Sequence, residues 1–252
     1  MKLFLPSNMF ASIFSESIKA DSGFEIIKKE SALLCKQLES DTSAVALIPT
    51  LEIINHRTLF VSGKCALSFD GMLSNAYLSF HDQQKNISKL KLRGDVSINE
   101  IILAKILFSE RYSSEIEFAL DPSKDKAGNE NYLIVGDENY NTGVYKTAIS
   151  FADQVAELLD LPYVNYVFAS QDKDSIEKLN LLSDNIDSKI EDNLPATLSK
   201  FNYDIELKNF VQENINSVYY EMIQNEIDAA NELLKLVYYH GIIDDMFDIK
   251  FV

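Results

Sequence analysis

The apolar positions of the first fifty residues alternate between strand and helix patterns. Strand-like runs at Lys2 to Leu5, Phe24 to Lys28 and Ala44 to Ile48 are separated by helical patterns at about Met9 to Lys19 and Ser31 to Leu38. This order is typical of parallel β-structure with crossover helices. The continuously apolar run from Ala44 to Ile48 predicts a strand buried on both faces, and ligands of such sheets bind beyond the carboxyl ends of the strands.

The rest of the chain predicts a second lobe and a helical end. Extended runs at Ala66 to Phe69, Leu73 to Phe80, Glu115 to Leu120 and Tyr132 to Asp137 surround a helix at Ile98 to Glu110. The helix Phe151 to Leu159 and the strand Tyr163 to Ala169 follow, and helical patterns dominate from Asp174 onward. We expect a two-lobed α/β fold with mixed, mostly parallel sheets. Residues 1–74 and 170–252 form the first lobe, residues 75–169 form the second, and the C-terminal helices pack on the first.

Composition and charge narrow the class of partner. The formal net charge is −16 and the pI is near 4.6, so the long-range field opposes binding to nucleic-acid phosphates or anionic membranes. No apolar run is long enough for a signal sequence or a bilayer span, which favours the cytoplasm. A small-molecule or protein partner fits better.

The usual sequence patterns for metal and phosphate chemistry are missing. Cys35 and Cys65 lack CxxC spacing, so we expect two reduced, buried thiols. The three histidines form no HxH or HExxH pattern, and we expect no metal. The sequence also has no GxSxG and no glycine-rich phosphate loop. These absences argue against serine hydrolases, P-loop enzymes and Rossmann dehydrogenases.

Four segments are similar, in order, to one known family. They are Asn8 after the first strand, Ala44 to Glu52, Asp70 to Ser79, and Ile134 to Asp137 followed by Phe151 to Val164. This succession resembles the menaquinone-biosynthesis proteins of the futalosine route, above all chorismate dehydratase, which have a type II periplasmic-binding-protein fold. The resemblance implies a lyase that removes water from a dicarboxylate ligand between the lobes, without a cofactor.

The resemblance also implies site residues. The turn asparagine and crossing-strand serine that are proposed to act in the family map onto Asn8 and Ser74, and a shift of register by one residue puts Asn75 in place of Ser74. We place the substrate anchors at Thr50 with the amides that follow it, and at Ser97 to Asn99. Simple N-capping is the alternative for Ser97.

One departure from the family pattern concerns anion binding. The family's Ser-Arg-Thr-Ser helix entry reads Val96-Ser97-Ile98-Asn99 here, so its arginine is missing. Arg93 is the candidate replacement as a carboxylate clamp, and solvent exposure of Arg93 is the alternative. Two functions therefore stay open: a chorismate dehydratase-like lyase, and a protein on the same fold that binds or senses a small anion without catalysis.

Overall fold

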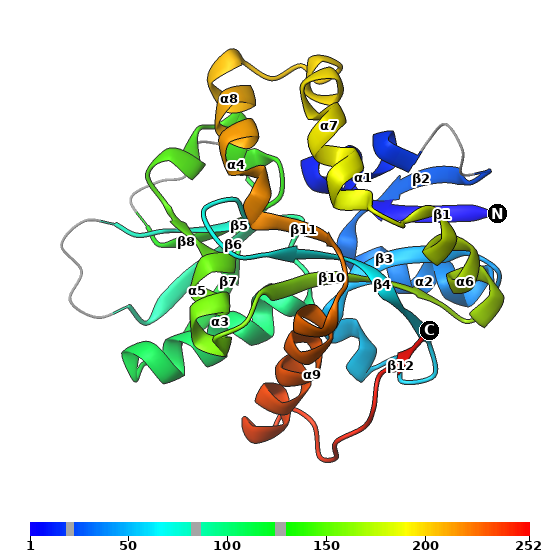
Figure 1. The fold of residues 1–252 in the computed structure, drawn as a ribbon. Helices are drawn as coiled ribbons and strands as arrows, with labels where there is room; N and C mark the ends of the chain where they lie inside the picture. The colour runs from blue at the N-terminus through cyan, green and yellow to red at the C-terminus, as the bar shows by residue number, and fades with distance from the viewer. Residues whose placement is uncertain (19–22, 82–86, 124–129) are drawn as a thin grey trace.

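The computed structural model describes residues 1–18, 23–81, 87–123 and 130–252, and these form two β-sheets with helices around each (Figure 1). The larger sheet belongs to the N- and C-terminal parts of the chain, and the smaller sheet belongs to the middle. The two-lobed mixed α/β fold that the sequence predicts is confirmed.

The larger sheet has seven strands in the order β11-β4-β10-β3-β1-β2, with β12 also paired to β4. Its strands are β1 (Lys2–Pro6), β2 (Glu25–Lys29), β3 (Val45–Pro49), β4 (Phe60–Phe69), β10 (Tyr163–Ser170), β11 (Val218–Glu221) and β12 (Lys250–Phe251). β1 pairs in parallel with both β2 and β3, and β10 runs antiparallel to β3 and β4. Every residue of β3 and β10 is buried, as the unbroken apolar run in β3 predicts.

The smaller sheet has five strands in the order β7-β6-β8-β5-β9. They are β5 (Ala76–Ser79), β6 (Lys89–Gly94), β7 (Glu117–Leu120), β8 (Tyr132–Val135) and β9 (Ile149–Ser150). β6 is parallel to β7 and β8, and β5 is antiparallel to β8 and β9. The helices of this lobe are α3 (Ile98–Tyr112), α4 (Glu138–Asn141) and α5 (Phe151–Leu159), with the 3₁₀ turn η3 (Val144–Lys146).

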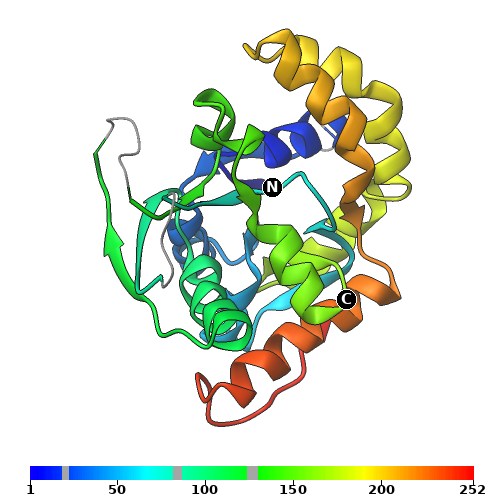
Figure 2. The same cartoon turned by 90° about the vertical axis from the view of Figure 1, so that its left-hand side faces the viewer.

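The helices of the first lobe follow its parallel strands and its C-terminal part. The first group is α1 (Met9–Ile18), η1 (Ser31–Leu33), α2 (Leu34–Ser40) and η2 (Thr50–Ile54), and the Lys19 end predicted for the first helix lies outside the described residues. The second group is α6 (Lys173–Leu182), α7 (Ile186–Ser199), α8 (Ile205–Asn214), η4 (Ile215–Ser217) and α9 (Gln224–Tyr239). α7 and α8 lie at one end of the molecule and α9 at the opposite end (Figures 1 and 2). No helix among the described residues is both long and apolar enough to cross a membrane.

The C-terminal helices reach both lobes. α7 packs against α1, and α9 packs against β10. α8 contacts the second lobe, where the Phe210 ring lies 4.8 Å from the Tyr145 ring and Glu206 pairs with Lys146. β10 pairs only within the larger sheet among the described strands, so we propose that the chain returns to the first lobe near residue 163 rather than at 170.

Candidate functional site at the lobe interface

Two neighbouring strands of the second lobe end in the same dipeptide, Gly-Asp. β6 ends at Gly94 and is followed by Asp95, while β8 is followed by Gly136 and Asp137. The strands are parallel and Gly94 lies opposite Val135. Gly94 has a φ of +88°, and a Cβ there would lie 2.0 Å from the Val135 carbonyl oxygen. Only glycine fits this close approach. Because the strands are parallel and in this register, both carboxylates emerge from the same edge of the sheet.

Asp137 reaches across to the start of α1. Its Oδ1 accepts a hydrogen bond of 2.7 Å from the backbone amide of Met9, the first residue of that ten-residue helix. A carboxylate is favourable there because it satisfies an amide without a helical partner and meets the positive end of the helix dipole. Burial nevertheless raises the pKa of Asp137, and this effect exceeds the lowering of the pKa by the Met9 amide and by the positive charge of Lys28.

Asp95 makes the equivalent contact with Ser31, after β2. Its two carboxylate oxygens accept from the Ser31 amide at 2.8 Å and from the Ser31 hydroxyl at 2.6 Å. The Ser31 hydroxyl lies 2.9 Å from the Tyr166 hydroxyl, which accepts from Asn75 Nδ2 at 3.1 Å. A continuous hydrogen-bonded chain thus runs from Asn75 through Tyr166 and Ser31 to Asp95. Burial raises the pKa of Asp95 as well.

Asn99 of the second lobe makes the third contact, with the Leu51 amide that follows β3. Its Oδ1 accepts from the Leu51 amide at 2.9 Å, and its Nδ2 donates to the Asn165 carbonyl at 2.6 Å. The neighbouring Thr50 hydroxyl donates to the Val164 carbonyl at 2.7 Å. Asn99 therefore joins α3 of the second lobe to both η2 and β10.

These contacts form one pattern. The amides of Met9, Ser31 and Leu51 follow the carboxyl ends of three adjacent parallel strands, and each donates to a side chain of the second lobe. This edge of a parallel sheet is where ligands of such folds bind. The chain's own carboxylates and amide thus occupy the donors that an anionic ligand would use.

The buried polar atoms that lack a hydrogen-bond partner within the described part of the chain include Asn8 Nδ2 and Asn75 Oδ1 at this interface. Both side chains are 1% exposed. The Asn8 Oδ1 accepts from the Ala11 amide at 2.8 Å and so caps α1, which leaves only its NH₂ group unused. An unsatisfied buried polar atom costs about 1–3 kcal/mol, so the pair indicates a place for a polar ligand or water.

Of the residues that the sequence singles out, Asn75 and Asn99 hydrogen-bond to the other lobe, and Asn8 and Thr50 directly precede the Met9 and Leu51 amides that do so. Ser74 lies beside them, but backbone groups occupy its hydroxyl. It donates to the Ala76 carbonyl at 2.6 Å and accepts from the Ala76 and Ala152 amides, both at 3.1 Å. Ser74 thus accepts a hydrogen bond at the start of α5, and Asn75 is the residue of this pair that contacts the other lobe.

Ser97 and Arg93 have partners within the second lobe. Ser97 caps α3 through a capping box, in which its amide and hydroxyl donate to Glu100 and its hydroxyl accepts from the Asn99 amide. Arg93 is buried, with its Nε 2.7 Å from Glu138 Oε1 and its Nη1 3.7 Å from Asp121 Oδ2. Its charge is therefore neutralised by carboxylates of the chain, which does not favour the expected role as a ligand clamp.

Four residues of the interface are missing from the site that the sequence predicts: Ser31 as an interlobe donor, Asp95, Asp137 and Tyr166. The repeated Gly-Asp after an apolar strand, at Gly94-Asp95 and Gly136-Asp137, is the signal that could have identified both aspartates. Ser31 and Tyr166 carry no local signal, because each looks like an ordinary helix cap or strand residue.

Comparisons with known proteins bear on the fold. No known family model matches the chain, and no curated protein sequence is similar to it. Among solved structures it is similar to protein AF1704 from Archaeoglobus fulgidus, with a TM-score of 0.62 at 15% identity over 96% of this chain and 98% of that one. It is also similar to the periplasmic aliphatic sulphonate binding protein SsuA from Escherichia coli, with a TM-score of 0.64 at 9% identity over 99% of this chain and 95% of that one.

A third similar structure is the alkanesulfonate-binding protein SsuA from Xanthomonas axonopodis pv. citri bound to MOPS. The TM-score is 0.60 at 6% identity, over 96% of this chain and 93% of that one. Matches of nearly full length at such low identity establish the fold alone. The chain has the two-lobed fold of the periplasmic binding proteins.

Proposed function

We propose that this protein binds a small organic anion between its two lobes. The observation that carries the proposal is the set of three amides, at Met9, Ser31 and Leu51, that point from one sheet edge into the interface. Amides at helix starts are natural partners for carboxylate, sulfonate and phosphate oxygens. Two proteins of similar fold are named for binding sulfonates, which are anions of this kind.

Binding proceeds by exchange of acceptors. The ligand's oxygens replace the carboxylates of Asp137 and Asp95 at the amides of Met9 and Ser31, so the number of hydrogen bonds is conserved. The displaced side chains return to water, which relieves the desolvation that raises the pKa of each. This relief favours the ligand-bound arrangement, and it partly offsets the cost of separating the lobes.

The interface also indicates the character of the ligand. Asn8 Nδ2 is a donor that suits an anionic oxygen, whereas Asn75 Oδ1 is an acceptor that suits a hydroxyl group. Arg93 is engaged by Glu138 and Asp121, so neutral amides and amide side chains hold the anion. These features favour a hydroxyl-bearing carboxylate of modest charge.

A binding panel with one diagnostic variant tests this proposal. Calorimetric titrations would use chorismate, simpler hydroxycarboxylates and an alkanesulfonate. Asn8→Asp keeps the Oδ1 that caps α1 but replaces the unpartnered NH₂ with a carboxylate oxygen, so we expect at least a tenfold loss of affinity. Asn193→Ala, at an exposed asparagine bonded to its own helix, is the matched control and should bind normally. Equal affinity of wild type and Asn8→Asp would contradict the proposal.

The second candidate is the dehydration of chorismate, which the family resemblance implies for a cytoplasmic protein of menaquinone biosynthesis. Asn8 and Asn75 favour it, because they bring an unpartnered donor and an unpartnered acceptor to the interface where a substrate's carboxylate and departing hydroxyl would lie. Closure of the lobes would exclude water during the elimination. The Ser74 hydroxyl accepts from the Ala152 amide of α5. In this mechanism Ser74 would therefore not touch the substrate and would only position Asn75.

Turnover separates the two candidates. Purified protein is incubated with chorismate, and the loss of its cyclohexadiene absorbance is followed together with product mass. Turnover that Asn8→Asp abolishes and Asn193→Ala preserves would support a lyase. Saturable chorismate binding without turnover would leave the protein as a binding or sensor protein.

A further inference from the structure

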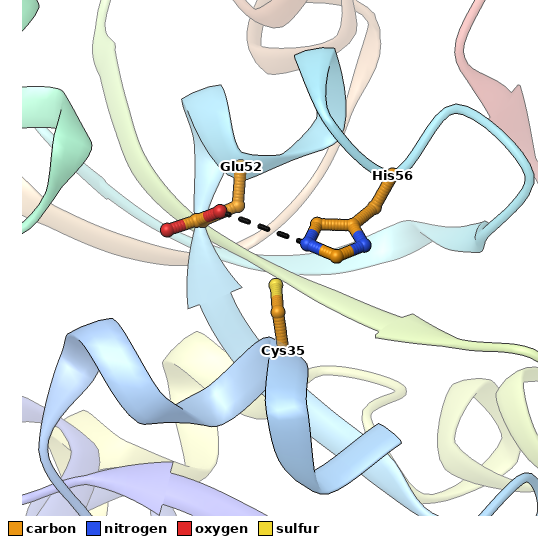
Figure 3. A group of neighbouring side chains, drawn as sticks. All are labelled: Cys35, Glu52 and His56. Carbon is orange, nitrogen blue, oxygen red and sulfur yellow. Dashed lines mark ion pairs between the residues drawn. The ribbon is translucent and has the colours of Figure 1, made fainter. Parts of the chain in front are cut away.

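Cys35, Glu52 and His56 bring three metal-ligating side chains together (Figure 3). Cys35 lies on α2, Glu52 lies on η2 and His56 lies in the turn that follows η2. The sulfur, a carboxylate oxygen and an imidazole nitrogen all lie within 4.8 Å of one another. Figure 3 shows the Cys35 sulfur pointing toward the space between the other two side chains.

The separations suit a tetrahedral metal ion. With metal–ligand distances of about 2.0–2.3 Å, the ligand atoms of a zinc site are roughly 3.3–3.8 Å apart. Glu52 Oε2 and His56 Nε2 are already 3.9 Å apart. Side-chain movements of an ångström or less would therefore complete a three-ligand site, with no change of the backbone.

The backbone holds these ligands in place. The Asn55 amide donates to the Glu52 carbonyl at 3.0 Å, and the His56 amide donates to the Ile53 carbonyl at 3.1 Å. The Leu59 amide in turn donates to the His56 carbonyl at 3.1 Å. Cys35 is buried, whereas the Glu52 and His56 side chains are 16% and 27% exposed. The site is thus rigid at its base and open to solvent at its rim, which gives an ion a route of entry.

Two simpler interpretations explain less. A weak ion pair between Glu52 and His56 accounts for those two residues but not for the thiol beside them. A Cys–His nucleophile needs an activated thiolate, whereas burial and the Glu52 carboxylate raise the pKa of the Cys35 thiol. A divalent cation accounts for all three side chains at once, because thiolate sulfur, carboxylate oxygen and imidazole nitrogen are all metal ligands and here lie within 4.8 Å of one another.

We propose that Cys35, Glu52 and His56 bind a zinc-like divalent cation, with the fourth position left to water. The mixture of sulfur, nitrogen and one carboxylate oxygen selects zinc over magnesium or calcium, which prefer oxygen ligands throughout. The ion ties α2 to η2. The Leu51 amide of the lobe interface lies in η2, and the Ser31 amide lies in η1, directly before α2.

Metal titration of the full-length protein tests the site without reference to any organic ligand. Zinc is titrated against a chromophoric chelator, and cobalt(II) is used to record an absorption spectrum. We expect one ion per chain and a thiolate-to-cobalt charge-transfer band that Cys35→Ser abolishes. His56→Gln, at the partly exposed rim, should fold normally and weaken zinc binding at least about 100-fold, since loss of even an outer partner costs 10–100-fold. At zinc concentrations 100 times the Kd, the thermal midpoint should rise by roughly 5–10 °C.

His240→Gln is the matched control. His240 Nε2 lies 3.0 Å from Glu110 Oε1, so it is a second histidine–carboxylate pair on the same protein. Zinc affinity and the cobalt spectrum should be unchanged in this variant. Zinc binding that is equally tight in Cys35→Ser and His56→Gln, a cobalt spectrum without the thiolate band, or no stoichiometric binding at all would overturn the proposal.

Discussion

Replacing Asp95 with alanine tests whether side chains of the second lobe hold the two lobes together. The wild-type carboxylate accepts from the Ser31 amide at 2.8 Å and from the Ser31 hydroxyl at 2.6 Å. Ser31 is 1% exposed, so water cannot replace these bonds unless the lobes separate. The variant must therefore either leave a buried amide unsatisfied or open the interface.

The expected loss of unfolding free energy in Asp95→Ala follows from the two hydrogen bonds to Ser31 and from the desolvation of the Asp95 carboxylate. Hydrogen bonds to a charged group are worth about 1.5–3 kcal/mol each. Burial raises the pKa of Asp95, so part of that gain is already cancelled. We expect Asp95→Ala to lower the free energy of unfolding by about 2–3 kcal/mol, which is roughly 5–10 °C in a protein of this size. Asp95→Asn keeps an acceptor for the Ser31 amide without the charge and should cost less than about 1 kcal/mol.

Thermal unfolding and hydrogen exchange measure the effect. In Asp95→Ala the midpoint should fall and the Ser31 amide should exchange faster. Asp204→Ala is the control, because Asp204 accepts from the Leu207 amide at 2.8 Å as the cap of α8. It should cost about 1 kcal/mol and leave exchange at Ser31 unchanged. An Asp95→Ala protein with the wild-type midpoint and wild-type exchange at Ser31 would show that Asp95 does not hold the lobes together.

Two further predictions concern pH and a glycine. Burial raises the pKa of Asp187 to about 6. Protonated Asp187 therefore stabilises the folded state fully below pH 4, and this contribution to the free energy of unfolding is lost as the pH rises through 6. Urea midpoints should rise between pH 7.5 and 5.5, by an amount equivalent to about 0.5–0.8 kcal/mol after solvent screening, and Asp187→Asn should reduce this slope; an unchanged slope would disprove it. In the same assay, Gly94→Ala should lower the free energy of unfolding by at least about 2 kcal/mol, because the new Cβ meets the Val135 carbonyl. The control Gly241→Ala has open space around its Cβ and should lower it by only about 1 kcal/mol. Equal losses in the two variants would contradict the steric explanation.

The fold was predictable because its signals are local. The run Ala44 to Ile48 is apolar without interruption, which only a strand covered on both faces explains, and β3 is buried throughout. Thr50 and Asn99 could be placed at the lobe interface for a similar reason, whereas the placement of Asn8 came from the family resemblance. Each is a polar residue at the end of a strand or the start of a helix, where parallel sheets bind ligands.

The remaining site features depend on contacts between distant residues. Ser74 and Asn75 differ by one position, and neighbouring positions at a strand face opposite sides, so an uncertain register exchanges their roles. Arg93 meets Glu138 only because β6 and β8 pair side by side. The chain of Asn75, Tyr166, Ser31 and Asp95 likewise joins residues from four segments of both lobes, which no spacing in the sequence reveals.

Amide NMR of the labelled protein during titration with chorismate and other hydroxycarboxylates shows directly whether an anion binds at the lobe interface. We expect saturable shifts at the amides of Met9, Ser31 and Leu51, with the Asp95 and Asp137 carboxylates released to more ordinary pKa values. Unchanged signals at these three amides at millimolar ligand, or shifts confined to residues outside the lobe interface, would contradict this expectation.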